Sequence, residues 1–297
     1  MGVVEKAGAA FDPIAAKEKK KKKKKKPAPD QFTIDFERME GLGYYHPERL
    51  GTPLAMELRA VKRRLLRRLG FLRASGDRQA FRKPGRQRNL VLVTSAQASE
   101  GKTFCSANLA LSLSFEDQIE TVLVDADVPR PKVRERFGLE RKAGLTDCLT
   151  TPSLDTAFVM SKANGAPLRI LTEGAPVDRA ADLFSGQACQ QLFSDLSTRY
   201  RDGIVLIDAP PVLARTEAVV LAKYVDEIAF VVSANETQEP AVAAALDELL
   251  DVNPNVSLIL NRCLIGAGAA SYGSYEYYGR DDDGAAAKKI GWDKNHD

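Results

Sequence analysis

The sequence predicts an α/β fold with a mostly parallel sheet and helices on both faces, because short hydrophobic segments alternate with segments of helical length. The expected strands are rich in Val, Ile and Leu: Leu90–Thr94, Thr121–Asp125, Leu168–Leu171, Ile204–Asp208, Glu227–Val232 and Val256–Asn261. The helices expected between them include Thr103–Phe115, Gly186–Arg201 and Pro240–Asp251. Ligands of such sheets bind at the carboxyl ends of the strands, so functional residues should follow directly after them.

Length and composition favour one globular domain with extensions. The chain has 297 residues, of which 44% are hydrophobic. No apolar run reaches the roughly 18–20 residues of a transmembrane helix, and we identify no secretory signal. The four cysteines lack the spacing of a disulfide framework or a zinc site and favour a cytoplasmic protein. They are Cys105, Cys148, Cys189 and Cys263.

Charge divides the chain into a basic N-terminal part and an acidic remainder. Residues 1–88 carry 24 Lys and Arg against 10 Asp and Glu, whereas residues 89–297 carry 19 against 30. The sequence predicts four parts. They are a basic, largely disordered leader at 1–50, a basic amphipathic helix and linker at 51–88, a core at 89–265, and a flexible tyrosine-rich tail at 266–297.

The leader contains an unbroken lysine run, Lys19–Lys26. Such a run repels itself and cannot form a core. It is either a solvated tail or an electrostatic attachment to anionic lipid, worth about 1 kcal/mol per basic residue near the membrane surface. Nucleic-acid binding is disfavoured because no aromatic residues interleave with the lysines.

A phosphate-binding loop is predicted where the first core strand runs into a helix. The segment Ser95–Thr103 ends in Gly101-Lys102-Thr103, with Ala96 at the first glycine position of the usual pattern. Backbone N–H groups of such a loop surround phosphates, the lysine reaches the β- and γ-phosphates, and the threonine hydroxyl binds Mg²⁺. The predicted nucleotide-binding residues here are Ala98, Ser99, Glu100, Gly101, Lys102, Thr103 and Phe104.

Carboxylates follow two further strands. Asp125 ends the strand Thr121–Asp125 and Asp127 follows it two residues later, and we expect both to face the crevice. Asp208 ends the strand Ile204–Asp208 and precedes a double proline, which is the form of a Walker B motif that holds Mg²⁺. Because unpaired carboxylates are costly to bury, a divalent cation or a proton in transfer is the expected partner.

The C-terminal tail contains a cluster of tyrosines, Tyr272, Tyr275, Tyr277 and Tyr278, flanked by glycines and followed by Asp281–Asp283. Its glycines and its place after the last strand disfavour a core strand. It is either a partly ordered tail or the substrate of a kinase that acts on hydroxyl groups.

The loop, the two aspartate motifs and the tyrosine cluster together resemble the bacterial tyrosine kinases of exopolysaccharide and capsule biosynthesis. Within that family, the chain is most similar to the exosortase-associated (XrtA-type) tyrosine autokinases. The resemblance covers about residues 50–280 and implies a P-loop NTPase fold of the deviant Walker (MinD/ParA-like) type, with ATP and Mg²⁺ as cofactors. It also implies autophosphorylation of the tyrosine cluster.

The resemblance also assigns roles to residues and partners. Lys102 and Asp125 would act in catalysis, the latter by assisting deprotonation of the tyrosine, and Asn261 would contact adenine. Thr103, Asp127 and Asp208 would hold the metal, with Asp127 also counted as catalytic. Implied partners are the cytoplasmic segment of a membrane polysaccharide co-polymerase, further copies of the chain in a ring, and a cognate tyrosine phosphatase. The implied location is the inner face of the plasma membrane.

The chain departs from the family pattern at several positions. Ala98 and Ser99 replace a Pro-Gly pair, and Pro129 stands where Arg is common. The helix that forms rings in the family usually reads Glu-x-x-Arg-x-x-Arg, and its places are taken here by Met56, Arg59 and Lys62. These departures put ring assembly in more doubt than nucleotide binding.

The sequence leaves two alternatives to a kinase open. One is a switch ATPase like the septum-positioning and chromosome-partitioning ATPases, although their extra signature lysine is replaced here by Gln97. The other is a non-catalytic, nucleotide-sensing scaffold of a polysaccharide export complex.

Overall fold

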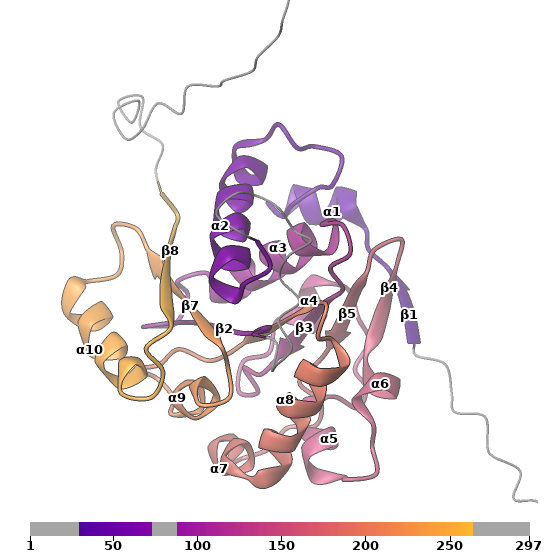
Figure 1. The fold of residues 1–297 in the computed structure, drawn as a ribbon, viewed down its shortest axis with the longest axis vertical. Helices are drawn as coiled ribbons and strands as arrows, with labels where there is room; N and C mark the ends of the chain where they lie inside the picture. Colours follow the sequence, from indigo (N-terminus) through magenta and orange to yellow (C-terminus); the bar gives the residue numbers. More distant parts are fainter. Residues whose placement is uncertain (1–29, 73–87, 264–297) are drawn as a thin grey trace, which may run out of the picture.

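The computed structural model describes residues 30–72 and 88–263, which form an eight-stranded sheet with helices on both faces (Figure 1). The strands are β1 (Asp30–Thr33), β2 (Leu90–Ser95), β3 (Thr121–Asp125), β4 (Ser161–Asn164), β5 (Leu168–Leu171), β6 (Ile204–Asp208), β7 (Glu227–Ser233) and β8 (Val256–Asn261). Their order across the sheet is β1-β4-β5-β3-β6-β2-β7-β8. The β4–β5 pair is antiparallel and the other pairs are parallel, so the mostly parallel sheet is confirmed.

The central strands β2, β3 and β6 are buried along their whole length. Continuous runs of Val, Ile and Leu are what a parallel strand covered on both faces requires. Successive residues of β2 enter opposite cores, with Leu90 and Leu92 in one and Val91 and Val93 in the other. All six predicted strands are present, each within one residue of its expected bounds.

Helices pack against both faces of the sheet. One face carries α1 (Phe36–Gly41), α2 (Pro53–Leu69), α3 (Lys102–Ser114) and α4 (Val133–Arg136). The other carries α5 (Leu145–Thr150), α6 (Thr156–Val159), α7 (Ala180–Ser185), α8 (Gln187–Arg199), α9 (Glu217–Ala222) and α10 (Glu239–Leu250). Figure 1 shows α2 and α3 on one side of the sheet and α7 and α8 on the other.

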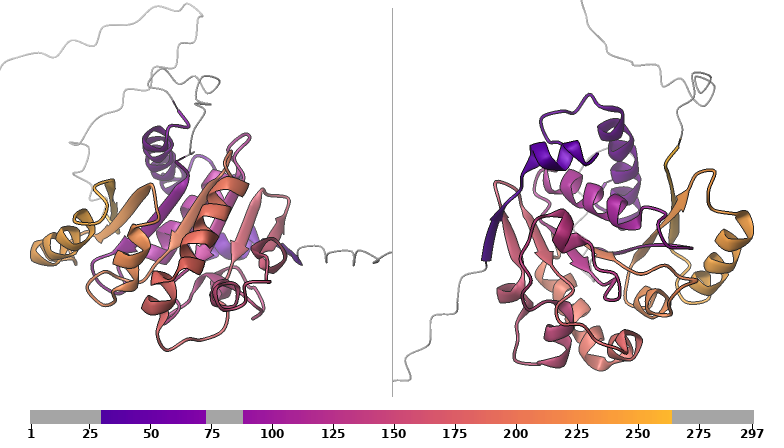
Figure 2. Two further views of the ribbon diagram at one scale, coloured as in Figure 1. Left: turned by 60° about the horizontal axis from the view of Figure 1, so that its bottom comes forward. Right: turned by 180° about the vertical axis from the view of Figure 1, so that it is seen from behind.

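Residues 30–50 depart from the predicted organisation, which placed them in a disordered leader. Strand β1 pairs with β4 and lies at the outer edge of the sheet (Figure 2). Met39 and Tyr45 are buried in the core on the α2–α3 face, and the Tyr45 backbone N–H donates to Asn108 Oδ1 at 2.7 Å. The prediction is wrong for this segment because its apolar side chains bury surface against the core. The lysine run at 19–26 and the tyrosine cluster at 272–278 lie outside the described residues.

The predicted basic helix is α2, and it is held to the core by ion pairs as well as by its leucines. Thr52 caps its start, Pro53 occupies its first turn, and Gly70 ends it in a left-handed conformation. Lys62 Nζ lies 2.8 Å from Glu116 Oε2 and donates to the Ser112 carbonyl at 3.1 Å. Within residues 30–72 and 88–263, no helix is both long and apolar enough to span a bilayer.

Candidate functional site

The loop between β2 and α3 has the backbone shape that a phosphate-binding loop needs. Gly101 has φ +92° and Ser99 has φ +69°, so both lie in the left-handed region. A Cβ atom on Gly101 would lie 2.0 Å from Asn261 Nδ2, so only glycine fits there. No described side chain caps α3, and its first N–H groups therefore remain available to an anion.

Glu100 and Asn261 support this loop from behind. Glu100 is buried, with one carboxylate oxygen accepting from the Gln97 N–H at 2.6 Å and the other from the Thr237 hydroxyl. Asn261 Nδ2, at the end of β8, donates to the Glu100 carbonyl at 2.9 Å. The structure thus places both residues where they hold the loop in shape. Whether Asn261 also contacts adenine stays a prediction.

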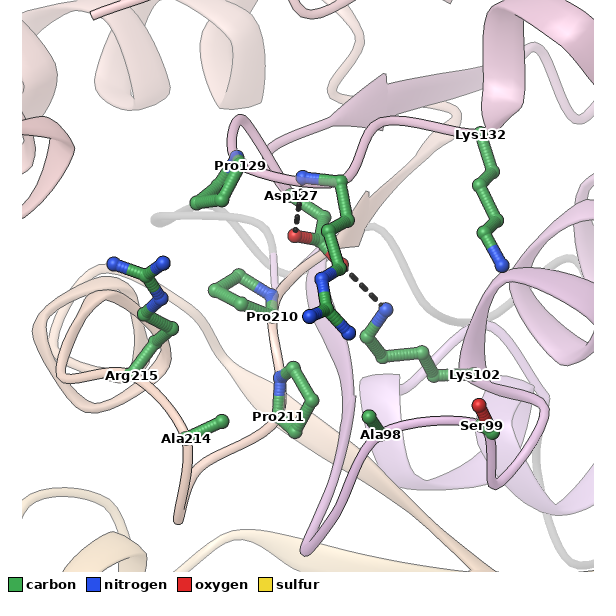
Figure 3. Close-up of a pocket in the computed structure, with 11 residues that line it drawn as sticks. Ala98, Ser99, Lys102, Asp127, Pro129, Lys132, Pro210, Pro211, Ala214 and Arg215 are labelled. Carbon is green, nitrogen blue, oxygen red and sulfur yellow. Dashed lines mark hydrogen bonds and ion pairs between the residues drawn. The ribbon is translucent and has the colours of Figure 1, made fainter. Parts of the chain in front are cut away.

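Lys102 is paired with Asp127 at the carboxyl end of the sheet. Its Nζ lies 2.6 Å from Asp127 Oδ2, and both side chains are mostly buried (Figure 3). Burial lowers the pKa of Lys102, but the carboxylates of Asp208 and Asp127 more than offset it, so the pKa is raised and the lysine stays charged. The structure therefore brings the predicted lysine and metal-binding aspartate together.

Asp125 is placed differently from the expectation. It is fully buried, and its carboxylate accepts from the backbone N–H groups of Asp127, Lys132 and Val133 at 3.2, 3.1 and 3.0 Å. It shapes the turn after β3 and does not line the pocket beside Lys102. The expectation that both Asp125 and Asp127 face the crevice is therefore wrong for Asp125. Burial, followed by the charge of Asp208 on the next strand, raises its pKa well above the usual range.

The environment of the Asp208 carboxylate is suited to a metal ion. Both of its carboxylate oxygens are buried without a hydrogen bond of ordinary geometry among the described residues. Burial raises the pKa of Asp208 by more than the charge of Lys102 and the nearby hydroxyls of Thr103 and Ser106 lower it, so its pKa is about 6. A buried carboxylate with open acceptor sites beside a threonine hydroxyl suits Mg²⁺.

The described residues contain no cluster of three or more His, Cys, Asp and Glu side chains placed to hold a metal. Mg²⁺ usually keeps several waters and binds through one or two carboxylates plus substrate phosphates. Thr103, Asp127 and Asp208 therefore fit as part of a coordination shell that a nucleotide would complete.

A pocket of about 340 Å³ opens beside this group. In Figure 3, Lys102 reaches toward Asp127, while Arg215 lies on the far side beyond the double proline. Four basic residues line the pocket against the single carboxylate of Asp127, and they are Lys102, Arg130, Lys132 and Arg215. Such an excess of positive charge suits the phosphate chain of a nucleotide.

A second pocket of about 270 Å³ lies beside the first turn of α3. The predicted residues Ser99, Gly101, Lys102, Thr103 and Phe104 line it. Sequence reasoning missed its other residues, which are Leu42, Tyr44, Lys132, Arg136 and Arg262. The basic residues just after the Asp127 motif were a usable signal, whereas the N-terminal residues were overlooked because of the neighbouring lysine run.

The chain is a P-loop nucleotide-binding protein by class. The features that define this class are the phosphate-binding loop between β2 and α3, the Lys102–Asp127 pair and the buried carboxylate of Asp208. No family model matches the chain. Tyrosine-protein kinase YwqD of Bacillus subtilis (strain 168) is 31% identical over 202 residues, which are 68% of this chain and 82% of that protein. The chain spans only 26% of the longer tyrosine-protein kinase Wzc of Salmonella typhi, at 28% identity.

Solved structures agree with these sequence similarities. The VpsO kinase domain is 30% identical with a TM-score of 0.58, covering 70% of this chain and 97% of that chain. The kinase domain of the Escherichia coli tyrosine kinase ETK is 25% identical with a TM-score of 0.56, covering 64% and 73%. The chain therefore belongs to the bacterial tyrosine-protein kinases. Its assignment to the exosortase-associated branch stays a prediction.

Proposed function

We propose that the chain uses MgATP to phosphorylate the tyrosines of its own C-terminal tail and thereby regulates the polymerisation or export of an exopolysaccharide. The observation that carries this proposal is the Lys102–Asp127 pair, which lies in a strongly basic pocket beside the unsatisfied carboxylate of Asp208. Phosphoryl transfer depends mainly on positioning and charge neutralisation, and these residues supply both.

The phosphates would bind the backbone N–H groups of residues 99–103 and the side chain of Lys102. They would compete with Asp127 for the lysine and so release that carboxylate. Thr103, Asp127 and Asp208 would hold Mg²⁺, which when bound neutralises charge on the phosphates. Arg130 and Arg215, which line the same pocket, would stabilise the charge that develops on the transferred group.

A tyrosine hydroxyl has a pKa of about 10, so a carboxylate must accept its proton. Asp125 was predicted for this role, and its raised pKa favours taking up a proton. Its carboxylate is committed to three backbone N–H groups, however, so residues 127–133 would have to move before a tyrosine hydroxyl reaches it.

The test is incubation with radiolabelled MgATP followed by phosphoamino-acid analysis. Changing Tyr272, Tyr275, Tyr277 and Tyr278 to Phe should remove most of the labelled phosphotyrosine and leave ATP affinity unchanged. A single change should have little effect, because neighbouring tyrosines substitute for one another. Tyr200→Phe is the matched control, since this buried tyrosine lies far from the loop and contacts Met160.

Equal labelling of the quadruple variant and the wild type would exclude the tail as the substrate. If the wild type takes up no label, even with a membrane partner's activating segment present, a switch ATPase or a nucleotide-sensing scaffold explains the site better. Each added phosphate brings roughly −1.5 to −2 charge. Phosphorylation should therefore add to the negative charge that Glu276 and Asp281–Asp283 give the tail, and repulsion between neighbouring tails should loosen a ring of subunits.

We further propose that the protein works at the inner face of the plasma membrane, beside a polysaccharide co-polymerase, and that a cognate phosphatase reverses its phosphorylation. Met56 and Arg59 on α2 are exposed and available to another copy, whereas Lys62 is already paired with Glu116. Deleting residues 1–29 removes the lysine run and leaves β1 whole. Unchanged cosedimentation with anionic vesicles at low salt would argue against attachment through these lysines.

A further inference from the structure

We propose that the N-terminal residues Leu42–Tyr44 form one wall of the nucleotide site, with the Tyr44 ring against the base or ribose. The proposal rests on the proposed binding of ATP at residues 99–103. It assigns a binding role to a segment that the sequence placed outside the catalytic core. The ligand class is the nucleoside part of a nucleoside triphosphate.

The smaller pocket supplies the geometry. Leu42 and Tyr44 form one side of it, and residues 99–104 form the other. The Tyr44 and Phe104 rings lie 5.1 Å apart between centroids, at an interplanar angle of 44°. Gly43 has φ +84°, and a Cβ atom there would lie 3.7 Å from Phe104, so the segment turns closely over the start of α3. An aromatic pair thus borders a pocket that begins at the phosphate-binding loop.

The direction in which a nucleotide would lie follows from the two pockets. Ser99, Lys102 and Lys132 line both of them, so the pockets adjoin at the loop. The terminal phosphate belongs beside Asp127 and Asp208, where the basic pocket opens. The nucleoside must then extend the opposite way, into the pocket bordered by Tyr44 and Phe104. A base is a suitable occupant there because it stacks favourably on aromatic side chains.

The Leu42–Tyr44 segment is attached, through the backbone of Tyr45, to the same helix that carries Lys102 and Thr103. The Tyr45 N–H donates to Asn108 Oδ1 at 2.7 Å, and Asn108 Nδ2 donates to the Phe104 carbonyl at 3.0 Å. The Tyr44 N–H donates to the Met39 carbonyl at 2.9 Å and so joins the segment to α1. Nucleotide binding and docking of the N-terminal segment should therefore stabilise one another.

The test compares MgATP with magnesium tripolyphosphate, which has the phosphates but no nucleoside, by calorimetry on the full chain. Tyr44→Leu should weaken MgATP binding about tenfold, the order expected for losing one base–aromatic contact, and change tripolyphosphate binding less than about twofold. Tyr45→Leu is the matched control, because it removes the neighbouring ring but does not line the pocket. That variant should bind both ligands as the wild type does.

If Tyr44→Leu fails to fold, Leu42→Ala provides a second variant, because the Leu42 side chain is 47% exposed and contributes little to the core. Its control is Leu50→Ala, since Leu50 is 50% exposed and does not line the pocket. Leu42→Ala should also weaken MgATP selectively. Unchanged MgATP affinity in a folded Tyr44→Leu variant, or equal weakening of both ligands, overturns the inference. Equal wild-type affinity for the two ligands overturns it too, while leaving the P-loop site intact. Wild-type binding of neither ligand would instead overturn the proposed function.

Discussion

Buried carboxylates lie at both ends of the sheet, and the two ends treat them differently. At the amino end, Glu227 is fully buried, and one of its oxygens accepts from Arg68 Nε and from the Ser257 hydroxyl at 2.7 Å. Asp226 beside it accepts from the backbone N–H groups of Asn89 and Leu90. At the carboxyl end, Asp208 is equally buried, but neither of its oxygens has a hydrogen bond of ordinary geometry among the described residues.

The hydrogen-bonded carboxylates at the amino end stabilise the fold, whereas the Asp208 carboxylate at the other end is suited to bind a ligand. Burying a carboxylate without partners destabilises a fold, so proteins normally supply hydrogen bonds or a cation. At the amino end, Glu227 Oε1 follows this rule, whereas Oε2 has no hydrogen bond but lies 4.0 Å from the guanidinium of Arg88. The ion pair with Arg68 also holds α2 to the sheet. The carboxyl end departs from the rule where Lys102 and Thr103 meet the ends of β3 and β6. A ligand and its metal, rather than the protein, are expected to satisfy Asp208.

The largest expected effect comes from removing the cation at the carboxyl end. Lys102→Met should weaken MgATP binding on the order of 100-fold or more, because the charged hydrogen bonds to phosphate are lost. The protein should still fold, since the lysine contacts carboxylates and ligand rather than the hydrophobic core. Calorimetry measures the affinity, and Lys142→Met, which removes an ion pair with Asp30 at the sheet edge, is the control. Unchanged ATP affinity in a folded Lys102→Met protein contradicts the site.

Breaking the ion pair at the amino end should lower the stability of the fold and leave nucleotide affinity unchanged. Arg68→Met should lower the free energy of unfolding by about 1–3 kcal/mol, less than for a fully buried pair because Arg68 is 40% exposed and Arg88 lies nearby. MgATP affinity should not change. Urea denaturation and calorimetry together measure this, with Arg67→Met, an exposed neighbour on α2, as control. A loss of ATP affinity without a loss of stability would break the comparison between the two ends.

The smallest effect concerns the support behind the loop. Asn261→Ala removes the donor to the Glu100 carbonyl, a hydrogen bond worth about 0.5–1.5 kcal/mol. If Asn261 acts through the loop, MgATP and magnesium tripolyphosphate should weaken equally. A loss confined to MgATP would instead support the contact with adenine that the family resemblance implies.

The parts of the molecule that the sequence predicted are those whose signals are local. The strands were found because runs such as Leu90–Thr94 are continuously apolar. Lys102, Asp127 and Asp208 were predicted to lie together because each belongs to a strand end or to the loop after a strand, at the carboxyl edge of the sheet. Strand β4 was missed because Ser161–Asn164 is short and mostly polar, as suits its place near the sheet edge.

What the sequence did not predict depends on tertiary contacts. Tyr44 reaches the phosphate-binding loop only because residues 30–45 fold back onto α3, and no spacing along the chain records this approach. Arg262 reaches the same pocket from the end of β8. The orientation of Asp125 was missed because the turn at residues 127–133, rather than the strand, decides which groups its carboxylate meets.

The most direct test of the contrast between the two ends is the stability of Asp208→Asn with and without MgATP. The pKa of Asp208 is about 6 in the folded protein and about 4 when unfolded, so folding disfavours the charged form. In EDTA at pH 8, the variant should therefore be more stable than the wild type, by up to about 3 kcal/mol. This advantage should shrink as the pH falls from about 6 to about 4. With MgATP the order should reverse, because only the wild type gains stability. A variant that is less stable in EDTA at pH 8, or that gains as much from MgATP as the wild type, would contradict the assignment of Asp208 to the metal.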